Sequence, residues 1–541
     1  MTTDERIADV TDGLRGRGFE FTARSRDDGW FVYHGTLEGA GEDFACELQV
    51  DPKFSEYPRV RLLERPRGLP HVVPHLGVDC GICYIARGTV VLDIFDPAGQ
   101  TLACLDRAAE VFQDILAGKF REDLEDEFHA YWTGIFCLVD LRDDRLGKQI
   151  TQAVKNGRDV YPVVTDDLPR TQAKLKQLGW TTFDVPAVTY RVKTTAKPRP
   201  HNMRWPIENV QQLLEWQGLL DKQCRKKLLD RIQQARATPA ASVVLIIESP
   251  LMTYGVWVDL KKDTPPRPGT RKKKAAPLFS LSVVSLEVIR LDDQYMAERN
   301  QPGRKTLAGK RLVLVGCGTI GGYLADLLVK AGAGTDGGSL ELVDFDNLRP
   351  QNLGRHRLGF SGLFSNKAVA LKRELDAVAP GAKIAASTGD VQKAELSEFD
   401  LLIDATGEES LGHWLTRKYE GAATLTVWIE GPGVAVRGVM RASGKGGCFR
   451  CLYEANKDGL LQAVEGEMPR LLAGQGCEGL YVPFPATASL QAAALGAEMV
   501  SSWVNNDDAP TLRTRVLDYQ FQSATPDCSL LKQPGCPACS S

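Results

Sequence analysis

The sequence RLVLVGCGTIGG, Arg311 to Gly322, decides the fold of the C-terminal part of this chain. Leu312–Val315 is a short apolar run typical of a buried parallel strand, and Tyr323–Ala331 has helical apolar spacing. The glycines that allow a tight turn between them are Gly316, Gly318 and Gly321. Backbone N–H groups in such a turn, together with the N-terminus of a helix, favour an anion. This glycine pattern alone fits a nicotinamide-dependent dehydrogenase as well as an ATP-using enzyme.

Acidic strand ends and two cations separate these alternatives. The candidate residues are Asp344 and Asp346 in LELVDFDN, Asn352 and Arg355 in VDFDNLRPQNLGR, then Lys367, and Asp404 in LLIDATGEES. A strand-end acid can take ribose hydroxyls. Hydride transfer has no need for a second strand-end aspartate with an arginine and a lysine. ATP cleavage uses such cations against the triphosphate and a carboxylate to hold Mg²⁺. The sequence therefore predicts an ATP and Mg²⁺ site.

This order of elements resembles the adenylation domain of the ThiF/MoeB and ubiquitin-activating family, from about Leu307 to the C-terminus. The resemblance implies a doubly wound, Rossmann-like α/β domain over residues 293–541 that adenylates the C-terminal glycine of a small carrier protein. It also implies a homodimer in which Arg299 reaches the ATP of the partner subunit.

Length, charge and cysteine content limit the class of protein to which this chain can belong. A chain of 541 residues can hold about three domains, and a formal charge of -3 argues against nucleic acid as the main partner. No signal peptide opens the chain and no apolar run reaches the ~18 to 20 residues of a membrane helix. We therefore expect a soluble cytoplasmic protein. Thirteen cysteines without a secretory signal indicate thiol or metal chemistry.

Residues 1–133 show the pattern of a small α+β domain. We expect helices over Thr3–Gly16 and Leu102–Ala117, and strands over Trp30–Leu37, Phe44–Val50 and Val60–Glu64. With Tyr57-Pro58, a His/Pro loop and the sequence GIC, this order resembles the ubiquitin-conjugating fold, in which Cys83 is the catalytic cysteine. His75 stands where that family has an asparagine, and a histidine N–H is able to donate the same hydrogen bond. A redox or metal-binding pair of Cys80 and Cys83 remains an alternative.

Residues 134–292 carry little chemical signal. FCLVDL, VYPVV, ASVVLIIE and GVWVDL indicate strands, and Pro206–Ala237 indicates one or two helices with proline at the start. By resemblance to two-lobed activating enzymes, this region is a linker and an inactive adenylation-like domain. The basic, proline-rich Asp263–Pro277 predicts a surface loop.

Two further cysteine groups follow the glycine turn. Cys448 with Cys451 and Cys536 with Cys539 form two CxxC pairs, which predict a structural Zn²⁺ site. Cys477 precedes SLQAAALGAE, and the resemblance makes it a second thioester-forming cysteine; an exposed thiolate in a flexible loop is the nucleophile such a step needs. A packed structural cysteine is the alternative for Cys477.

A conjugating-type domain ahead of an activating-type domain resembles the ubiquitin-conjugation-like ligases of bacterial CBASS antiphage operons. The resemblance implies adenylation of the C-terminus of a cGAS-like nucleotidyltransferase or a ubiquitin-like protein, thioesters on Cys477 and Cys83, and transfer to amines of target proteins. Arg355, Lys367 and Asp404 would act in the adenylation step. A sulfur-carrier adenylyltransferase of ThiF/MoeB type and a non-catalytic nucleotide-switched scaffold are the alternatives.

Overall fold

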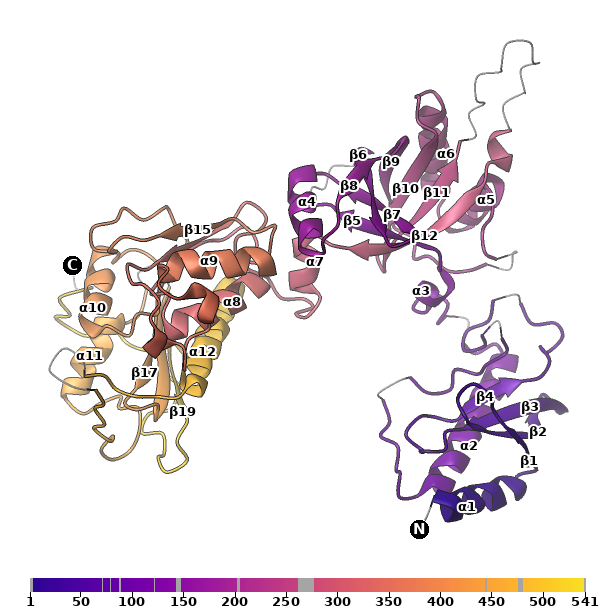
Figure 1. The fold of residues 1–541 in the computed structure, drawn as a ribbon, viewed down its shortest axis with the longest axis horizontal. Helices are drawn as coiled ribbons and strands as arrows, with labels where there is room; N and C mark the ends of the chain where they lie inside the picture. The colour runs from indigo at the N-terminus through magenta and orange to yellow at the C-terminus, as the bar shows by residue number, and fades with distance from the viewer. Residues whose placement is uncertain are drawn as a thin grey trace. The chain divides into compact units, whose positions relative to one another are not determined.

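A computed structural model describes residues 3–70, 72–77, 79–86, 89–120, 122–142, 147–201, 205–260, 277–442, 445–474 and 480–539 (Figure 1). Cys477 and nearly all of the predicted loop Asp263–Pro277 lie outside these described residues. The chain divides into two compact units. The first comprises residues 1–137, 145–151 and 184–289, and the second comprises residues 138–144, 152–183 and 290–541.

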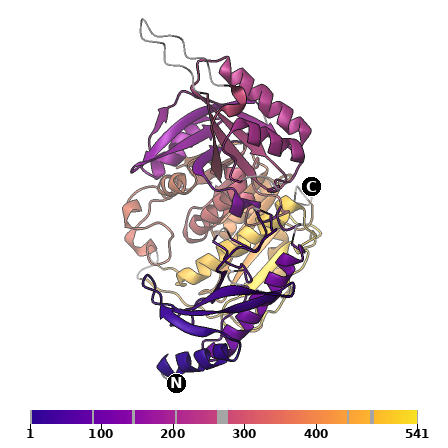
Figure 2. The same ribbon diagram turned by 90° about the vertical axis from the view of Figure 1, so that its right-hand side faces the viewer.

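The N-terminal domain of the first unit is a four-stranded antiparallel sheet with two helices (Figure 2). The strands, in sheet order, are β1 Glu20–Arg24, β2 Phe31–Gly39, β3 Glu42–Val50 and β4 Arg59–Leu62. The helices are α1 Thr3–Arg15 and α2 Pro97–Leu116. The predicted helices and three predicted strands are confirmed, whereas β1 was not predicted. Its burial pattern is exposed throughout, so it lacks the alternation that marks a half-buried strand.

Helix α2 begins earlier than its apolar spacing indicates, because local capping starts it. The side chain of Asp96 accepts a hydrogen bond from the N–H of Gly99 at 2.9 Å, and Pro97 occupies the first turn. One face of the helix, including Ala108, Phe112 and Ile115, is buried in the domain core.

The rest of the first unit holds strands in the order β12–β11–β10–β9 and a helical pair. The bounds are β9 Ala187–Lys193, α5 Val210–Leu220, α6 Lys222–Arg236, β10 Ser242–Glu248, β11 Thr253–Asp259, η1 Leu278–Ser280 and β12 Val283–Arg290. The prediction that Pro206 starts the helices was wrong. Asn209 caps α5 by accepting the N–H of Gln212 at 3.0 Å, so the first helix begins at Val210, four residues after Pro206.

The short helix α3 Phe128–Tyr131 anchors residues that follow the N-terminal domain. Phe128 stacks on Trp216 with ring centroids 5.7 Å apart, and Trp132 stacks on the same ring at 5.3 Å. The indole N–H of Trp132 donates to the carbonyl of Leu286 at 3.1 Å. Aromatic burial therefore fixes the chain directly after α3.

The second unit contains the predicted doubly wound sheet in the order β15–β14–β13–β16–β17–β18–β19. Its strands are β13 Arg311–Val315, β14 Ser339–Val343, β15 Ile384–Ser387, β16 Leu401–Asp404, β17 Thr424–Glu430, β18 Ala435–Arg441 and β19 Leu512–Val516. Pairing is parallel from β15 to β17 and antiparallel at β18 and β19. In the first unit β9 and β10 are likewise parallel, followed by antiparallel β11 and β12.

Helices and shorter elements complete the second unit. They are β7 Asp159–Thr165, α4 Leu168–Gln177, β8 Thr182–Asp184, α7 Asp293–Glu298, α8 Thr319–Lys330, η2 Pro350–Asn352, η3 Phe360–Gly362, α9 Lys367–Val378, α10 Glu409–Lys418, α11 Phe449–Lys457 and α12 Ala486–Asn505, together with the second half of β5 Ile135–Asp140. Strand β6 Gly147–Asn156 is divided between the two units.

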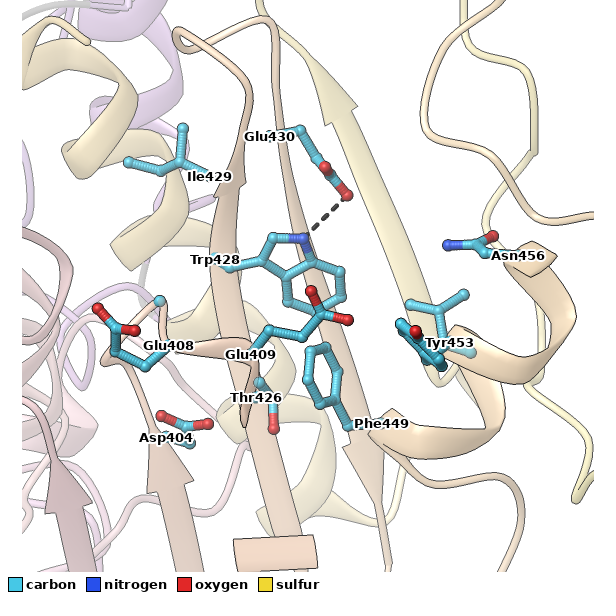
Figure 3. Close-up of a pocket in the computed structure, with 12 residues that line it drawn as sticks. Asp404, Glu408, Glu409, Thr426, Trp428, Ile429, Glu430, Phe449, Tyr453 and Asn456 are labelled. Atoms are coloured by element: carbon cyan, nitrogen blue, oxygen red, sulfur yellow. Dashed lines mark hydrogen bonds between the residues drawn. The ribbon is translucent and has the colours of Figure 1, made fainter. Parts of the chain in front are cut away.

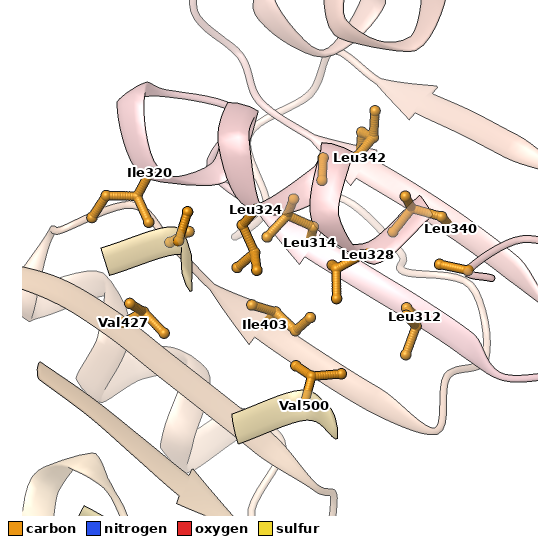
Figure 4. Packing of buried hydrophobic residues seen from close by; sticks show 14 of the residues in the cluster. Leu312, Leu314, Ile320, Leu324, Leu328, Leu340, Leu342, Ile403, Val427 and Val500 are labelled. Atoms are coloured by element: carbon orange, nitrogen blue, oxygen red, sulfur yellow. The ribbon is translucent and has the colours of Figure 1, made fainter. Parts of the chain in front are cut away.

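The core of the second unit follows from the alternation of apolar side chains along its central strands. Leu312 and Leu314 point to the face covered by α8 and α12, whereas Val313 and Val315 belong to a separate cluster with Leu415 of α10 (Figure 4). Both faces of the strand are therefore buried, as expected for a parallel sheet between helices. Packing between helices on both faces fixes the carboxyl ends of β13, β14 and β16, where a doubly wound fold binds its ligand.

In the described part of the chain, none of the helices combines the length and the apolar character needed to cross a bilayer.

Candidate active site

The glycine turn after β13 has the geometry of a phosphate cradle. Gly316 has φ +87°, and a Cβ there would lie 2.9 Å from the backbone of Thr406. Gly318 caps α8 and has nothing within 4 Å of a Cβ position, so the space above it is open to a ligand. Gly321 meets the carbonyl of Gly316, which a Cβ would approach to 1.8 Å. The first and third glycines thus allow close packing, and the middle one leaves room for a phosphate.

The acids at the end of β14 form a network around this turn. Asp344 accepts the N–H of Cys317 and the N–H of Asp346, both at 2.8 Å. Lys367 lies 2.8 Å from Asp346 through its Nζ atom. Burial raises the pKa of Asp344, although these hydrogen bonds and the Lys367 charge oppose that rise. The sequence-predicted Asp344, Asp346 and Lys367 therefore do meet in one place.

These residues line a cavity of about 620 Å³ at the carboxyl end of the sheet. Its walls come from eight separate segments of the chain, and the lining includes Gly316, Gly318, Asp344, Asp346, Arg355, Lys367, Asp390, Thr406, Glu408, Tyr481 and Phe484. The glycine cradle, the acids and the two cations thus face one space.

Arg355 is turned toward the segment after the undescribed residues 475–479. Its guanidinium carbon lies 4.2 Å from the ring centroid of Phe484 and 5.5 Å from that of Tyr481. Nη1 donates to the carbonyl of Val482 at 3.4 Å, while Nε is buried without a hydrogen-bond partner. Burial lowers the pKa of Arg355. An arginine held this way has donor capacity left for an anion in the cavity.

Sequence reasoning missed His356, the neighbour of Arg355. Its Nδ1 accepts the N–H of Leu358 at 3.0 Å, so Nε2 carries the proton and donates to the carbonyl of Cys317 at 3.0 Å. Burial lowers its pKa to about 4. A neutral histidine therefore braces the glycine turn. No periodic or motif signal marks it, because its role depends on a contact 39 residues away.

Asp404 ends β16 and is 4% exposed. Thr406 donates both its N–H and its hydroxyl to Oδ1, at 3.1 and 2.7 Å. No described residue donates to Oδ2. Burial raises the pKa of Asp404 to about 6, with a smaller contribution from Glu408. A buried carboxylate with one oxygen unused is suited to a bound cation.

Gly321 and Asp404 are chain neighbours of lining residues but do not line the cavity themselves, and two further predicted site residues lie elsewhere. Asn352 caps η2 by accepting the N–H of Arg349 at 2.9 Å and is not part of the cavity wall. Arg299 is exposed and donates to the hydroxyl of Tyr295 at 2.7 Å. Its reach to a partner subunit stays a prediction.

Cys83 lies in the N-terminal domain, directly after a loop whose backbone is hydrogen-bonded to β4. Its side chain is exposed, and its N–H donates to the carbonyl of His75 at 2.9 Å. His75 adopts φ +61°, and its ring nitrogens lie 3.2 Å from Asp123 and 3.3 Å from Glu127. The backbone of His75 thus positions Cys83, whereas its ring is directed to two carboxylates.

Glu127 is the acidic neighbour of the Cys83 thiol that the sequence did not reveal. It accepts a hydrogen bond from the hydroxyl of Tyr131 at 3.0 Å. Burial raises the pKa of Cys83, and the charge of Glu127 raises it further. Cys80 and Cys83 are free thiols, and among the residues described they join no cluster of three or more metal-binding side chains.

Four buried cysteines form a separate cluster beside α11. All four Sγ atoms lie within 4.8 Å of one another, with Cys448 3.7 Å from Cys451 and 3.8 Å from Cys536, and Cys451 3.4 Å from Cys539. A tetrahedron of sulfurs about 2.3 Å from a zinc ion has edges of about 3.8 Å. The donor set fits zinc.

Models of two protein families match the two ends of the chain. The model of the ThiF family matches residues 291–538, and that of prokaryotic E2 family B matches residues 14–135. The solved structure of E. coli MccB with AMPCPP and MccA covers 43% of this chain and 66% of its own, at 19% identity and a TM-score of 0.33.

Curated relatives match over nearly the whole chain. An ATP-dependent ubiquitin transferase-like protein Cap2 of Pseudomonas aeruginosa is 51% identical over 545 residues, covering 100% of both chains. A Cap2 of Escherichia coli is 25% identical and covers 94% of this chain and 93% of its own. This chain, an enzyme with a ThiF-type adenylation domain and an E2-like domain, therefore belongs to the Cap2 family of ATP-dependent ubiquitin transferase-like proteins.

Proposed function

We propose that this enzyme uses ATP to adenylate the C-terminal carboxylate of a partner protein and transfers the acyl group through Cys477 and Cys83 to an amine. The observation that carries this proposal is the 620 Å³ cavity, which combines a glycine cradle, strand-end acids and two cations. In bond terms, a carboxylate oxygen attacks the α-phosphorus, and the bond from that phosphorus to the leaving pyrophosphate breaks. The product is an acyl-adenylate.

The residues of the cavity and the neighbouring Asp404 would each have a role in adenylation. The open backbone at Gly318 and the N-terminus of α8 would receive phosphate oxygens, and Asp344 would receive the ribose hydroxyls. Lys367 and Arg355 would neutralise charge as pyrophosphate leaves. Asp404 would hold Mg²⁺, which supplies Lewis-acid stabilisation of the phosphate oxygens.

Cys477 lies outside the described residues, but its chain neighbours support a nucleophile close to the adenylate. Ala473 and Tyr481 exchange two backbone hydrogen bonds of 2.9 Å, and Tyr481 lines the cavity. Cys477 is midway along the segment between them. Its thiolate would attack the acyl carbon, release AMP and form a thioester.

Cys83 would receive the acyl group by thioester exchange, in which its sulfur replaces that of Cys477. The attacking amine must then lose a proton, and Glu127 beside the thiol is a suitable acceptor. The amine nitrogen bonds to the acyl carbon, and Cys83 leaves as the thiolate. The carboxylates of Glu127, beside the thiol, and of Asp123, which faces the His75 ring, would also attract a lysine ammonium.

Zinc would be held by Cys448, Cys451, Cys536 and Cys539 as a structural ion. The second pair is 88 residues along the chain from the first, so the ion would fix the C-terminus to α11. We assign this site no part in the reaction.

The partner proposed is a cGAS-like nucleotidyltransferase or a ubiquitin-like protein, in the setting of CBASS antiviral defence. A homodimer through the adenylation domains is also proposed. Phe360 and Phe364 are 80% and 75% exposed in the second unit and would be covered in such a dimer.

The test is ATP–pyrophosphate exchange with purified enzyme and partner. Replacing Asp404 by alanine should lower the exchange rate by ~10² to 10³, since one preorganised charge is lost. Asp376→Ala, which removes an exposed carboxylate on α9 paired with Lys372, is the matched control. Exchange unchanged in the Asp404 variant would remove this residue from the site, and no exchange in the parent enzyme would reject the proposed adenylation.

A further inference from the structure

A second cavity, of about 310 Å³, shares a wall with the proposed adenylation site (Figure 3). Gly407, Glu408 and Ile429 line both cavities, and Asp404 lines the smaller one. Glu409, Trp428, Phe449 and Tyr453 are among the residues that line only the smaller one. A ligand that reaches the adenylation site along β17 would therefore pass this second cavity.

The cavity walls are aromatic. Trp428 and Phe449 meet edge to face with centroids 5.1 Å apart, and His413 joins Phe449 to Tyr453 at 5.2 and 5.1 Å. The electron-rich faces of such rings attract organic cations. Arg450 already lies over Tyr453 at 4.4 Å, and Arg437 lies over Trp428 at the longer distance of 5.8 Å. Phe449 has no such cation among the described residues, so its ring is the one most open to a ligand.

Acidic groups at the cavity outnumber the cations that neutralise them. Glu430 accepts from the indole N–H of Trp428 at 2.9 Å and pairs with the buried Arg437 at 3.5 Å, so its charge is compensated. Arg450 in turn pairs with Glu454.

Glu408 and Glu409 remain without a lysine or arginine partner among the described residues. The nearest base to Glu409 is His413 at 3.4 Å, and burial lowers the pKa of that histidine. Figure 3 shows the carboxylate of Glu409 beside the rings of Trp428 and Phe449.

The buried wall of the cavity adds the carboxylate of Asp404 to those of Glu408 and Glu409. Asp404 is 4% exposed, and its Oδ2 atom accepts no hydrogen bond from any residue the structure describes. Carboxylates beside open aromatic faces match a guanidinium, which stacks on rings and donates to carboxylates at the same time.

We propose that this cavity binds a cationic side chain, an arginine in preference to a lysine, carried by the C-terminal segment of the protein that is adenylated. The proposal rests on the proposed function and adds a specificity element to it. The carboxylate of the partner would enter the larger cavity, while a basic residue upstream of it would occupy the smaller one.

The experiment uses fluorescein-labelled heptapeptides with a free C-terminal glycine and the full-length enzyme. Arginine is placed in turn at the second to sixth position from the C-terminus, and citrulline, its neutral isostere, serves as the control peptide. Binding is measured by fluorescence anisotropy. At one position we expect arginine to bind roughly tenfold more tightly than citrulline.

Variants of the enzyme test whether the preference for arginine over citrulline arises in this cavity. Glu409→Gln should reduce it to about threefold or less, since one charge-assisted contact is lost. Glu409→Lys should abolish it by repulsion. Glu395→Gln, a change at an exposed carboxylate of the same unit outside the cavity, should leave the tenfold preference intact. Thermal melts establish that each variant is folded.

Failure of this proposal and of the adenylation proposal are distinguishable. An arginine preference that depends on Glu409, in an enzyme without pyrophosphate exchange, would keep the cation site and reject adenylation. Exchange with the partner but no charge preference at any peptide position, or no peptide binding at 1 mM, would overturn the cation site. A preference unchanged in Glu409→Lys would overturn it as well.

Discussion

Cysteine side chains occur in two contrasting surroundings in this enzyme. Cys448, Cys451, Cys536 and Cys539 are buried with their sulfurs converging. Cys83 is exposed, and its thiol interacts electrostatically with Glu127 and Tyr131. Both settings are built around CxxC sequences. Burial and neighbouring groups, more than the motif, therefore decide whether a cysteine holds a metal or carries an acyl group.

The largest expected effect concerns the buried set. Replacing Cys448 and Cys451 by serine should unfold the C-terminal part of the chain, because structural zinc contributes ~10 to 16 kcal/mol of apparent binding energy in small zinc peptides. Elemental analysis should find about one zinc per chain of the parent enzyme, and circular dichroism should report the loss of structure. Cys528→Ser is the control, since Cys528 packs against the cluster without belonging to it. A folded parent enzyme free of metal would refute the zinc assignment.

An all-or-none chemical effect is expected for the exposed thiol. Cys83→Ala should leave the fold and pyrophosphate exchange intact and trap the partner on Cys477, seen as a reductant-sensitive adduct on a gel. Cys477→Ala should leave exchange intact and remove every adduct, because the first thioester cannot form.

The matched control is Cys80→Ala, which removes the other thiol of the same CxxC sequence. An adduct on Cys83 in the Cys477→Ala enzyme would disprove the relay. Full activity of Cys83→Ala would instead favour the sulfur-carrier alternative.

A smaller effect is expected when the negative charge beside Cys83 is removed. Glu127→Gln keeps an acceptor for Tyr131 but removes a charge that raises the pKa of Cys83. The pKa should fall, so more thiolate is present near neutral pH and iodoacetamide should alkylate Cys83 about 2- to 5-fold faster. Burial, the larger cause, remains, so the pKa should stay above its ordinary value.

Site-resolved mass spectrometry over a pH series would give the midpoint of the alkylation rate. Glu122→Gln, at an exposed neighbouring acid, should leave that midpoint in place. A midpoint that rises in Glu127→Gln would contradict the assignment of the charge effect.

Local sequence was sufficient for the adenylation fold and most of its cavity. The turn after β13 needs glycine because of a positive φ and a backbone contact, and those requirements are visible in the spacing itself. Acids at strand ends were predicted to converge because parallel strands share an edge. Asp344 and Asp346 line the larger cavity, and Asp404 lines the cavity next to it. Asn352 was misplaced because a motif position does not reveal that its side chain caps its own turn.

Only the tertiary structure brought together groups that share no local pattern. Glu127 lies 44 residues from Cys83 in sequence, and His356 braces a turn 39 residues before it. Trp428, Phe449 and Glu409 meet at one cavity from three separate elements. Hydrophobic spacing and glycine positions encode backbone geometry over a few residues, so the sequence alone determined the elements and the cradle. Which polar side chains face a buried space depends on how those elements pack, and packing is a property of the whole chain.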